Sequence, residues 1–123
     1  MILHTVLFQP KPEVTGEGRR AFMTALQRAS SEIPEVRRAR IGRRVNVGAA
    51  YQGRNDQPYE YAAVIEFDSV EDLRTYFAHP LHQELGRQFW LACERTTIHD
   101  STAVDVADGR DLESLLADEG AGG

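Results

Sequence analysis

Apolar residues recur along this chain with the period of a strand in some segments and of a helix in others. Residues 2–8 are apolar on both strand faces, which predicts a strand covered on both sides that ends near Pro10. Residues 59–68 place an apolar side chain at nearly every second position, the pattern of a half-buried strand. Residues 96–106 are rich in Thr, Val and Ile and predict a last strand.

One further strand carries an unusual charge. Residues 36–47 hold five arginines interleaved with apolar residues, and we expect a strand there that is bent or bulged near Gly42. The stretch 48–58 contains Gly, Asn and Asp and predicts a loop. An arginine-rich strand is commonly a solvated edge, and Glu60 and Glu66 are the expected ion-pair partners.

Helical spacing separates these strands. Residues 16–31 repeat apolar side chains at helical intervals, with Thr15 as the expected N-cap. Ser69 is the expected cap of a second helix, with Asp72 at the capping-box position. Pro80 breaks this helix, and a third is expected over 81–95.

The resulting order is β-α-β-β-α-β, with the second helical region split by Pro80. This order predicts an α+β, ferredoxin-like fold with a four-stranded antiparallel sheet over residues 1–107. Helices cover one sheet face, and the apolar residues on the other face suggest a second subunit. We expect residues 108–123 to be an acidic, flexible tail. Alternatively, its leucines dock on the body or on the partner subunit: Leu112, Leu115 and Leu116.

Composition limits the class of protein. The chain has 123 residues, a single cysteine and a net charge of −5. Five acids and one arginine from residue 108 onward contribute −4, so the body carries only −1 and no strong footprint for nucleic acid. No apolar run approaches the ~20 residues of a membrane span, and the N-terminus lacks a basic signal region. We therefore expect a cytoplasmic protein without nucleic-acid or membrane partners.

Candidate chemistry centres on His82, which shares a helix face with Leu85 and Phe89. A neutral imidazole is a competent general base near neutral pH. Tyr76, across the Pro80 break, could hydrogen-bond His82 or a substrate carbonyl. Strand parity turns two further side chains toward the helices: His4 and Tyr61.

The candidate residues also have structural interpretations. A backbone carbonyl could satisfy His82, and Tyr76 could be a core aromatic residue. His79 precedes Pro80, where the chain turns, so we expect a structural role for it. His99 and Asp100 are adjacent in a strand and face opposite ways, so they form no dyad.

Metal and nucleophile motifs are missing from the sequence. Pro80 disrupts the helical spacing of His79 and His82, and Cys93 has no cysteine partner. We expect no metal and no required cofactor. An arginine that reaches the pocket to hold an anionic substrate group remains an alternative.

The stretch 59–82 reads YEYAAVIEFDSVEDLRTYFAHPLH, and the chain opens with ILHTVLF after Met1. Both resemble the stress-responsive A/B barrel domain (Dabb) family, in particular the strand ending in F-D-S and the H-P-x-H element that ends at His82. The likeness extends over about residues 2–106. It implies the ferredoxin-like fold and a homodimer in which two sheets close into one α+β barrel.

The resemblance also implies site residues. A plant member of the family cyclises a poly-β-keto thioester by aldol condensation, and the likeness places its catalytic His on His82 and its Tyr on Tyr76. Its N-terminal pocket histidine falls on His4. Its remaining pocket histidine is replaced here by Tyr61, a departure that leaves the substrate open.

These observations favour a small-molecule enzyme of the polyketide cyclase or isomerase type that transfers a proton next to a carbonyl. His82 and Tyr76 would be catalytic, and His4 and Tyr61 would bind a small hydrophobic or β-keto ligand. A non-catalytic, stress-associated ligand-binding dimer is the alternative hypothesis. A haem-binding, monooxygenase-like barrel is a third.

Overall fold

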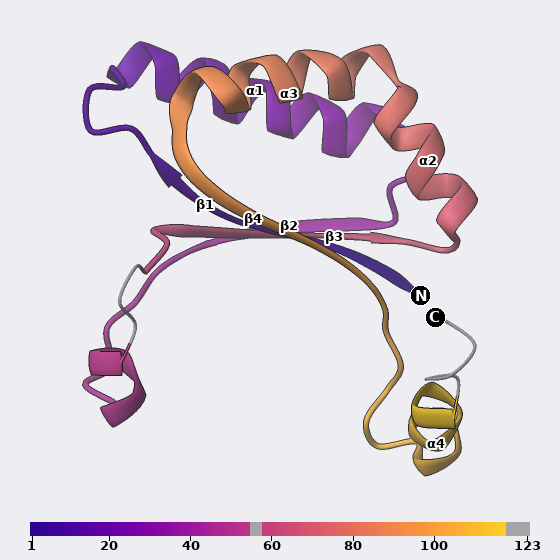
Figure 1. The fold of residues 1–123 in the computed structure, drawn as a ribbon. Coiled ribbons are helices and arrows are strands. Elements are labelled where there is room, and N and C mark those ends of the chain that lie inside the picture. The colour runs from indigo at the N-terminus through magenta and orange to yellow at the C-terminus, as the bar shows by residue number, and fades with distance from the viewer. Residues whose placement is uncertain (55–57, 118–123) are drawn as a thin grey trace.

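A four-stranded antiparallel sheet of order β2-β3-β1-β4 carries helices α1, α2 and α3 on one face (Figure 1). The computed structural model describes residues 1–54 and 58–117. The elements are β1 (Ile2–Pro10), α1 (Gly16–Glu32), β2 (Arg38–Arg43), η1 (Ala50–Arg54), β3 (Tyr61–Phe67), α2 (Val70–Ala78), α3 (Pro80–Ala92), β4 (Cys93–Thr102) and α4 (Gly109–Ala117). The predicted ferredoxin-like α+β fold is confirmed.

Strand β1 lies inside the sheet because it pairs with β3 on one side and β4 on the other. In this register His4 is opposite Ile65 of β3 and Asp100 of β4. Alternation then turns Ile2, His4 and Phe8 toward the helices, where all three are buried. The apolar pattern predicts that both faces of β1 are covered, and the helices cover this one.

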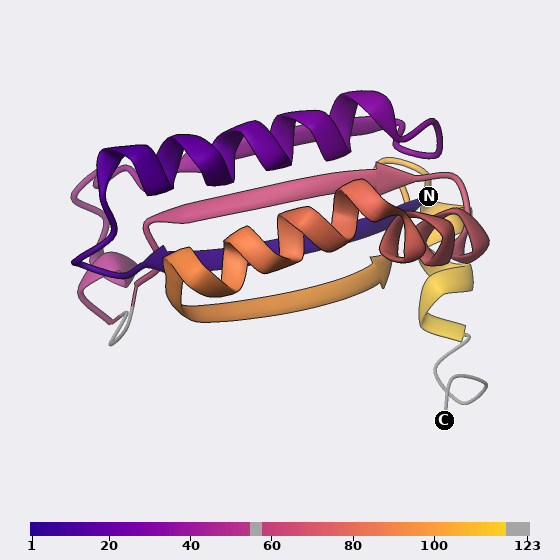
Figure 2. The same cartoon turned by 90° about the horizontal axis from the view of Figure 1, so that it is seen from above.

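Helices α1 and α3 lie side by side over the sheet, as Figure 2 shows. The expected caps are confirmed, because the Thr15 hydroxyl accepts from the Gly18 N–H at 3.0 Å and Ser69 Oγ accepts from the Asp72 N–H at 3.1 Å. The buried layer between helices and sheet consists mainly of aromatic and aliphatic residues. Among its members are Phe8, Phe22, Ala29, Ile33, Ile65, Phe67, Leu73, Tyr76, Leu85 and Phe89.

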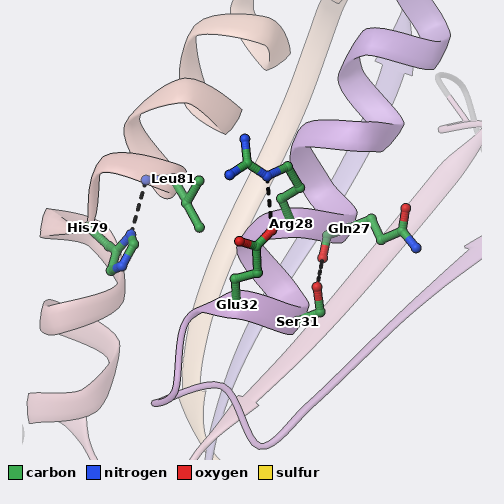
Figure 3. A network of polar contacts seen from close by, with 6 residues as sticks. All are labelled: Gln27, Arg28, Ser31, Glu32, His79 and Leu81. Carbon is green, nitrogen blue, oxygen red and sulfur yellow. Dashed lines mark hydrogen bonds and ion pairs between the residues drawn. The ribbon is translucent and has the colours of Figure 1, made fainter.

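His79 joins α2 to α3 and has the structural role that its position before Pro80 predicts. Its Nδ1 accepts from the Leu81 N–H at 3.0 Å, so the imidazole caps α3 (Figure 3). Pro80 occupies the first turn of α3, where its missing N–H costs no hydrogen bond. On neighbouring α1, a hydrogen bond from Arg28 holds the pKa of Glu32 below its usual value (Figure 3).

Strand β2 is shorter than expected and runs without a bulge at Gly42. It ends at Arg43 because that residue is opposite Tyr61, the first residue of β3, and a strand needs a partner. The side chain of Gln52 instead organises the next segment as a loop, with hydrogen bonds to Val45, Val47 and Ala49. The expected ion pairs are present, Arg43 to Glu60 at 3.0 Å and Arg38 to Glu66 at 3.8 Å.

The boundary between α3 and β4 also differs from the expectation, which extended the helix to Arg95. Helix α3 ends at Ala92, and β4 begins at once with Cys93. Pairing with β1 sets this boundary, because Gln9 pairs with Arg95 and the Lys11 N–H donates to the Ala92 carbonyl at 2.7 Å. At its other end β4 stops at Thr102, opposite Ile2, rather than at Val106.

The sheet face away from α1 and α3 carries half-buried apolar side chains, among them Leu3, Leu7 and Val64. Elements η1 and α4 lie on this side, at opposite ends of the sheet (Figure 1). Residues 109–117 of the expected flexible tail form α4, in which no residue is buried. Residues 118–123 lie outside the described part, and the flexibility of the tail stays a prediction.

Candidate functional site

An apolar cavity of about 190 Å³ lies between the sheet and the helices. Its polar side chains are His4, Tyr76 and His82. The remaining lining residues are apolar, and the main ones are Val6, Phe8, Phe22, Leu26, Ala63, Ile65, Phe77, Leu85, Phe89, Trp90 and Ile98, with Gly86 among them. A few convergent polar groups in an apolar cavity are the usual composition of a small-molecule site.

Three elements bring the polar side chains together. β1 supplies His4, α2 supplies Tyr76, and α3 supplies His82. The ring centroids of Tyr76 and His82 are 4.6 Å apart, and those of His4 and Tyr76 are 6.1 Å apart. The Phe77 ring lies 5.2 Å from both imidazoles. Sequence reasoning therefore placed three of its four site residues at one cavity.

The pKa of His82 is lowered from its ordinary value of 6.5, mainly because burial disfavours the charged imidazolium. The nearby His4 imidazole lowers it further, and a backbone hydrogen bond with Phe77 acts in the opposite direction. At neutral pH His82 is therefore the uncharged form that can accept a proton.

Tyr76 is almost fully buried, and burial raises the pKa of its phenol above the ordinary value of 10.0. The phenol therefore remains protonated throughout the neutral range. A neutral hydroxyl can donate a hydrogen bond to an oxygen that gains negative charge during a reaction. This gives the cavity a base and a donor in contact with each other.

His4 has a charged partner that sequence reasoning missed. Its Nδ1 lies 2.5 Å from Oδ1 of Asp100, on the neighbouring strand β4. Because a carboxylate only accepts, Nδ1 of His4 carries a proton and donates it to Asp100. Strand parity in the sequence places His99 and Asp100 on opposite faces of β4. It does not show which residue lies opposite Asp100, because that depends on the register between β1 and β4.

Tyr61 lies on the helix-covered sheet face, as its parity predicts, but it is not among the residues that line this cavity. Its ring stacks on Phe8 with centroids 5.3 Å apart, and the Arg43 guanidinium carbon lies 6.0 Å from the ring centre. Tyr61 is opposite Phe8 in the sheet, four residues along β1 from His4. The structure thus brings His4, Tyr76 and His82 together and leaves Tyr61 apart.

No arginine lines this cavity within residues 1–54 and 58–117. A second groove, between α1 and β2, has arginines among its lining residues and shares Leu26, Ala63 and Ile65 with the first cavity. It contains none of the histidines, so the candidate chemistry belongs to the first cavity. Three further cavity residues were not predicted from the sequence: Gly86, Trp90 and Ile98. Their positions fit the pattern of an ordinary helix or strand surface.

The described residues contain no group of three or more His, Cys, Asp or Glu side chains placed to hold a metal ion. Cys93 is buried at the start of β4, and burial raises the pKa of its thiol to about 11. That thiol is therefore neutral and unreactive at neutral pH. Within the same residues, every helix is too short or too polar to span a bilayer.

Known proteins share this fold and part of this sequence. The chain is 26% identical over 104 residues to olivetolic acid cyclase of Cannabis sativa, a match that covers 82% of this chain and 95% of the cyclase. Hydroxynitrile lyase from Passiflora edulis superimposes with a TM-score of 0.72 at 21% identity, over 85% of this chain and 94% of the lyase.

Another solved structure, a dimeric ferredoxin-like protein of unknown function from Thermobifida fusca, gives a TM-score of 0.66 at 22% identity. That match covers 83% of this chain and 90% of the other. The family profile of the stress responsive A/B barrel domain, Dabb, matches residues 2–103. The match takes in all four strands and the helices that carry the cavity, and on this basis the chain belongs to the Dabb family.

Proposed function

We propose that this protein is a cofactor-independent enzyme of the polyketide cyclase or lyase type, which transfers a proton next to a carbonyl group. One observation carries the proposal. An imidazole with a lowered pKa, His82, lies against the neutral phenol of Tyr76 on an apolar cavity. Removal of a proton beside a carbonyl needs this pair of groups, a base and a donor for the developing enolate.

In the proposed step, the substrate carbonyl accepts a hydrogen bond from the Tyr76 hydroxyl. Neutral His82 takes a proton from the adjacent carbon, and the electron pair of that C–H bond forms the enolate. The enolate carbon then attacks a second carbonyl of the same molecule, and the oxygen of that carbonyl takes the proton back from the His82 imidazolium to become a hydroxyl. Without a second carbonyl, the enolate carbon itself regains this proton. His4, held by Asp100, supplies a second polar group at the same cavity.

The size of the cavity restricts the substrate. An engineered apolar cavity of roughly 150 Å³ in another protein admits benzene, and the cavity here is about 190 Å³. A single ring or a short alkyl chain that bears a carbonyl fits these dimensions. The same size argues against the haem-binding alternative, because a porphyrin macrocycle is several times larger than one ring.

Relatives support this class of reaction. One is a cyclase and another a lyase by name, and both are similar to this chain over most of their length. The resemblance that places catalytic residues on His82 and Tyr76 points to the same two groups that meet at the cavity. Tyr61 lies outside the cavity and stacks on Phe8, which lines it. We therefore propose that Tyr61 supports the site through Phe8.

We also propose that the protein is a homodimer that packs the sheet face away from α1 and α3 against its copy. The half-buried apolar residues of that face and the dimeric state of several structural neighbours support this arrangement. The cavity lies on the other side of the sheet and stays accessible in such a dimer.

The single buried Cys93 is compatible with the reducing cytoplasm, where we place the protein.

The test is exchange of carbonyl-adjacent protons for deuterium, followed by proton NMR. Acetophenone and the N-acetylcysteamine thioester of acetoacetate are suitable probes, because each joins a carbonyl to exchangeable protons. The wild-type protein should accelerate exchange, and His82→Gln should reduce this acceleration at least a hundredfold. Arg20→Gln is the control, because Arg20 is exposed on α1, outside the cavity and away from the proposed dimer face.

The opposite result has a defined meaning. If both probes bind the cavity but exchange no faster with wild-type protein than with His82→Gln, the enzyme proposal fails. The protein would then be a ligand-binding dimer without catalytic activity, the second hypothesis that the sequence left open.

A further inference from the structure

The cavity has an open side between α3 and β4. Three apolar residues that line it are also exposed, Trp90 at 62%, Ile98 at 49% and Phe77 at 36%. They come from α3, β4 and α2, whereas the lining residues from α1 and the inner strands are mostly buried. A ligand can therefore reach the cavity past apolar side chains that already face solvent.

Gly86 lies on this cavity in the interior of α3. Glycine is a poorer helix former than alanine, so a mid-helix glycine usually has a local reason. Its φ is not positive, so the backbone does not require glycine. A Cβ built at this position would meet no atom within 4 Å, so close packing does not require it either.

The position of Gly86 relative to His82 supplies a reason. The two residues are four apart on one helix and therefore share a face. Side chains of a helix lean toward its N-terminus, so a larger residue at 86 would extend over the cavity beside the His82 imidazole. The missing side chain leaves space next to the proposed base.

We propose that Gly86 sets the size of the substrate beside His82, and that the substrate is a ketone or β-keto compound with one aromatic ring or a short alkyl chain, admitted between Trp90 and Ile98. This inference rests on the proposed proton transfer for the identity of the reacting group. The ligand class follows from the apolar lining and from the volume of about 190 Å³.

The experiment measures binding separately from catalysis. Trp90 is the only tryptophan of the chain and lies at the cavity, so its fluorescence reports occupation directly. Acetophenone and 4-propylacetophenone are titrated into wild-type protein, Gly86→Ala and Gly86→Leu, with calorimetry as a second readout. Gln83→Leu adds the same side chain at an exposed position of α3 outside the cavity and is the matched control.

We expect Gly86→Ala to raise Tm by a few degrees and to bind both probes within threefold of wild type. Gly86→Leu should fold, lose at least tenfold in affinity for acetophenone, and lose more for the propyl derivative. Gln83→Leu should bind as wild type does. Where circular dichroism shows that the leucine variant does not fold, Gly86→Met provides the same bulk with a more flexible side chain.

Unchanged affinity in folded Gly86→Leu would overturn the role of Gly86, and absence of acetophenone binding to wild-type protein would overturn the substrate class. Deuterium exchange separates this inference from the proposed function. If Gly86→Leu loses binding while wild-type protein binds without accelerating exchange, the size-setting role stands and the catalytic proposal fails.

Discussion

His4 and Asp100 are opposite each other in the antiparallel pairing of β1 and β4, and their side chains meet at 2.5 Å between Nδ1 and Oδ1. His4 is buried, whereas the Asp100 side chain is 43% exposed. The pair therefore links the cavity to solvent and fixes which nitrogen of His4 carries the proton. Similar carboxylate–imidazole contacts orient histidines in many sites that transfer protons.

Removal of the Asp100 carboxylate tests this contact. Asp100→Ala leaves the buried His4 Nδ1–H without an acceptor, and an unsatisfied buried donor costs about 1–3 kcal/mol. We expect a loss near the lower end, because Asp100 is partly exposed and water can replace it. Asp100→Asn should lose less, since its amide oxygen can accept from Nδ1. Urea denaturation measures both variants, and equal stability of all three proteins would contradict the account.

The lowered pKa of His82 predicts the pH dependence of activity. The midpoint of the fall in rate with decreasing pH should lie below 6.5, where the base becomes protonated, and the rate should approach a plateau above neutral pH. A midpoint above pH 6.5 would contradict this role of His82. Exchange rates from pH 4.5 to 9 measure this profile.

The same shift affects stability with a definite sign. Below pH 6.5 the unfolded chain binds a proton at residue 82 before the folded chain does, so the free energy of unfolding decreases as pH falls from 6.5 to the lower folded-state pKa. Above 6.5 both states are neutral there and this contribution is constant. His82→Gln should remove this part of the pH dependence in urea titrations. A curve identical to that of wild type would contradict the shift.

Tyr76→Phe separates the hydroxyl from the ring. The ring is almost fully buried and lies 5.0 Å from Phe67, so its packing persists in the variant. Within the described residues no hydrogen bond involves the Tyr76 hydroxyl, and stability should change by less than about 1 kcal/mol. Exchange activity should fall roughly a hundredfold, the usual effect of the loss of one donor to an oxyanion. Retained activity would assign Tyr76 to the core alone.

Phe8 is the aromatic centre of the layer that supports the site. It is 2% exposed, and its ring lies 5.3 Å from that of Phe22, 5.3 Å from Tyr61 and 5.7 Å from Phe89. Phe8→Ala should cost about 3–5 kcal/mol, whereas Phe8→Leu should cost about 1 kcal/mol because most of the volume remains. Urea unfolding of the two variants measures the difference. A small loss in Phe8→Ala would mean that the cavity wall collapses around residue 8.

Much of the fold could be predicted from the sequence because alternation and capping are local. The apolar faces of β1 and β3, and the caps at Thr15 and Ser69, follow from neighbouring residues and agree with the structure. The ends of β2 and β4 could not be predicted this way. A strand stops where its partner stops, and the partner is distant in sequence.

Local patterns also predicted part of the candidate site. Helical spacing places His82 toward the core, and strand parity places His4 there as well. Parity does not tell how far along the sheet a side chain lies, so Tyr61 was expected at a cavity that it does not line. The contact of Asp100 with His4 and the proposed role of Gly86 could not be predicted, because the first depends on the strand register and the second on empty space, and neither leaves a pattern in the sequence.

The proposed dimer can be broken without contact with the cavity. Val64 of β3 is half-buried and lies on the sheet face away from α1 and α3. A charge placed in an apolar interface is costly, because it must be buried without a partner. Val64→Asp should therefore yield a monomer by analytical ultracentrifugation, whereas Ile41→Asp, on the helix side of the edge strand β2, should remain dimeric. Circular dichroism checks that both variants fold, and a folded Val64→Asp dimer would place the interface elsewhere.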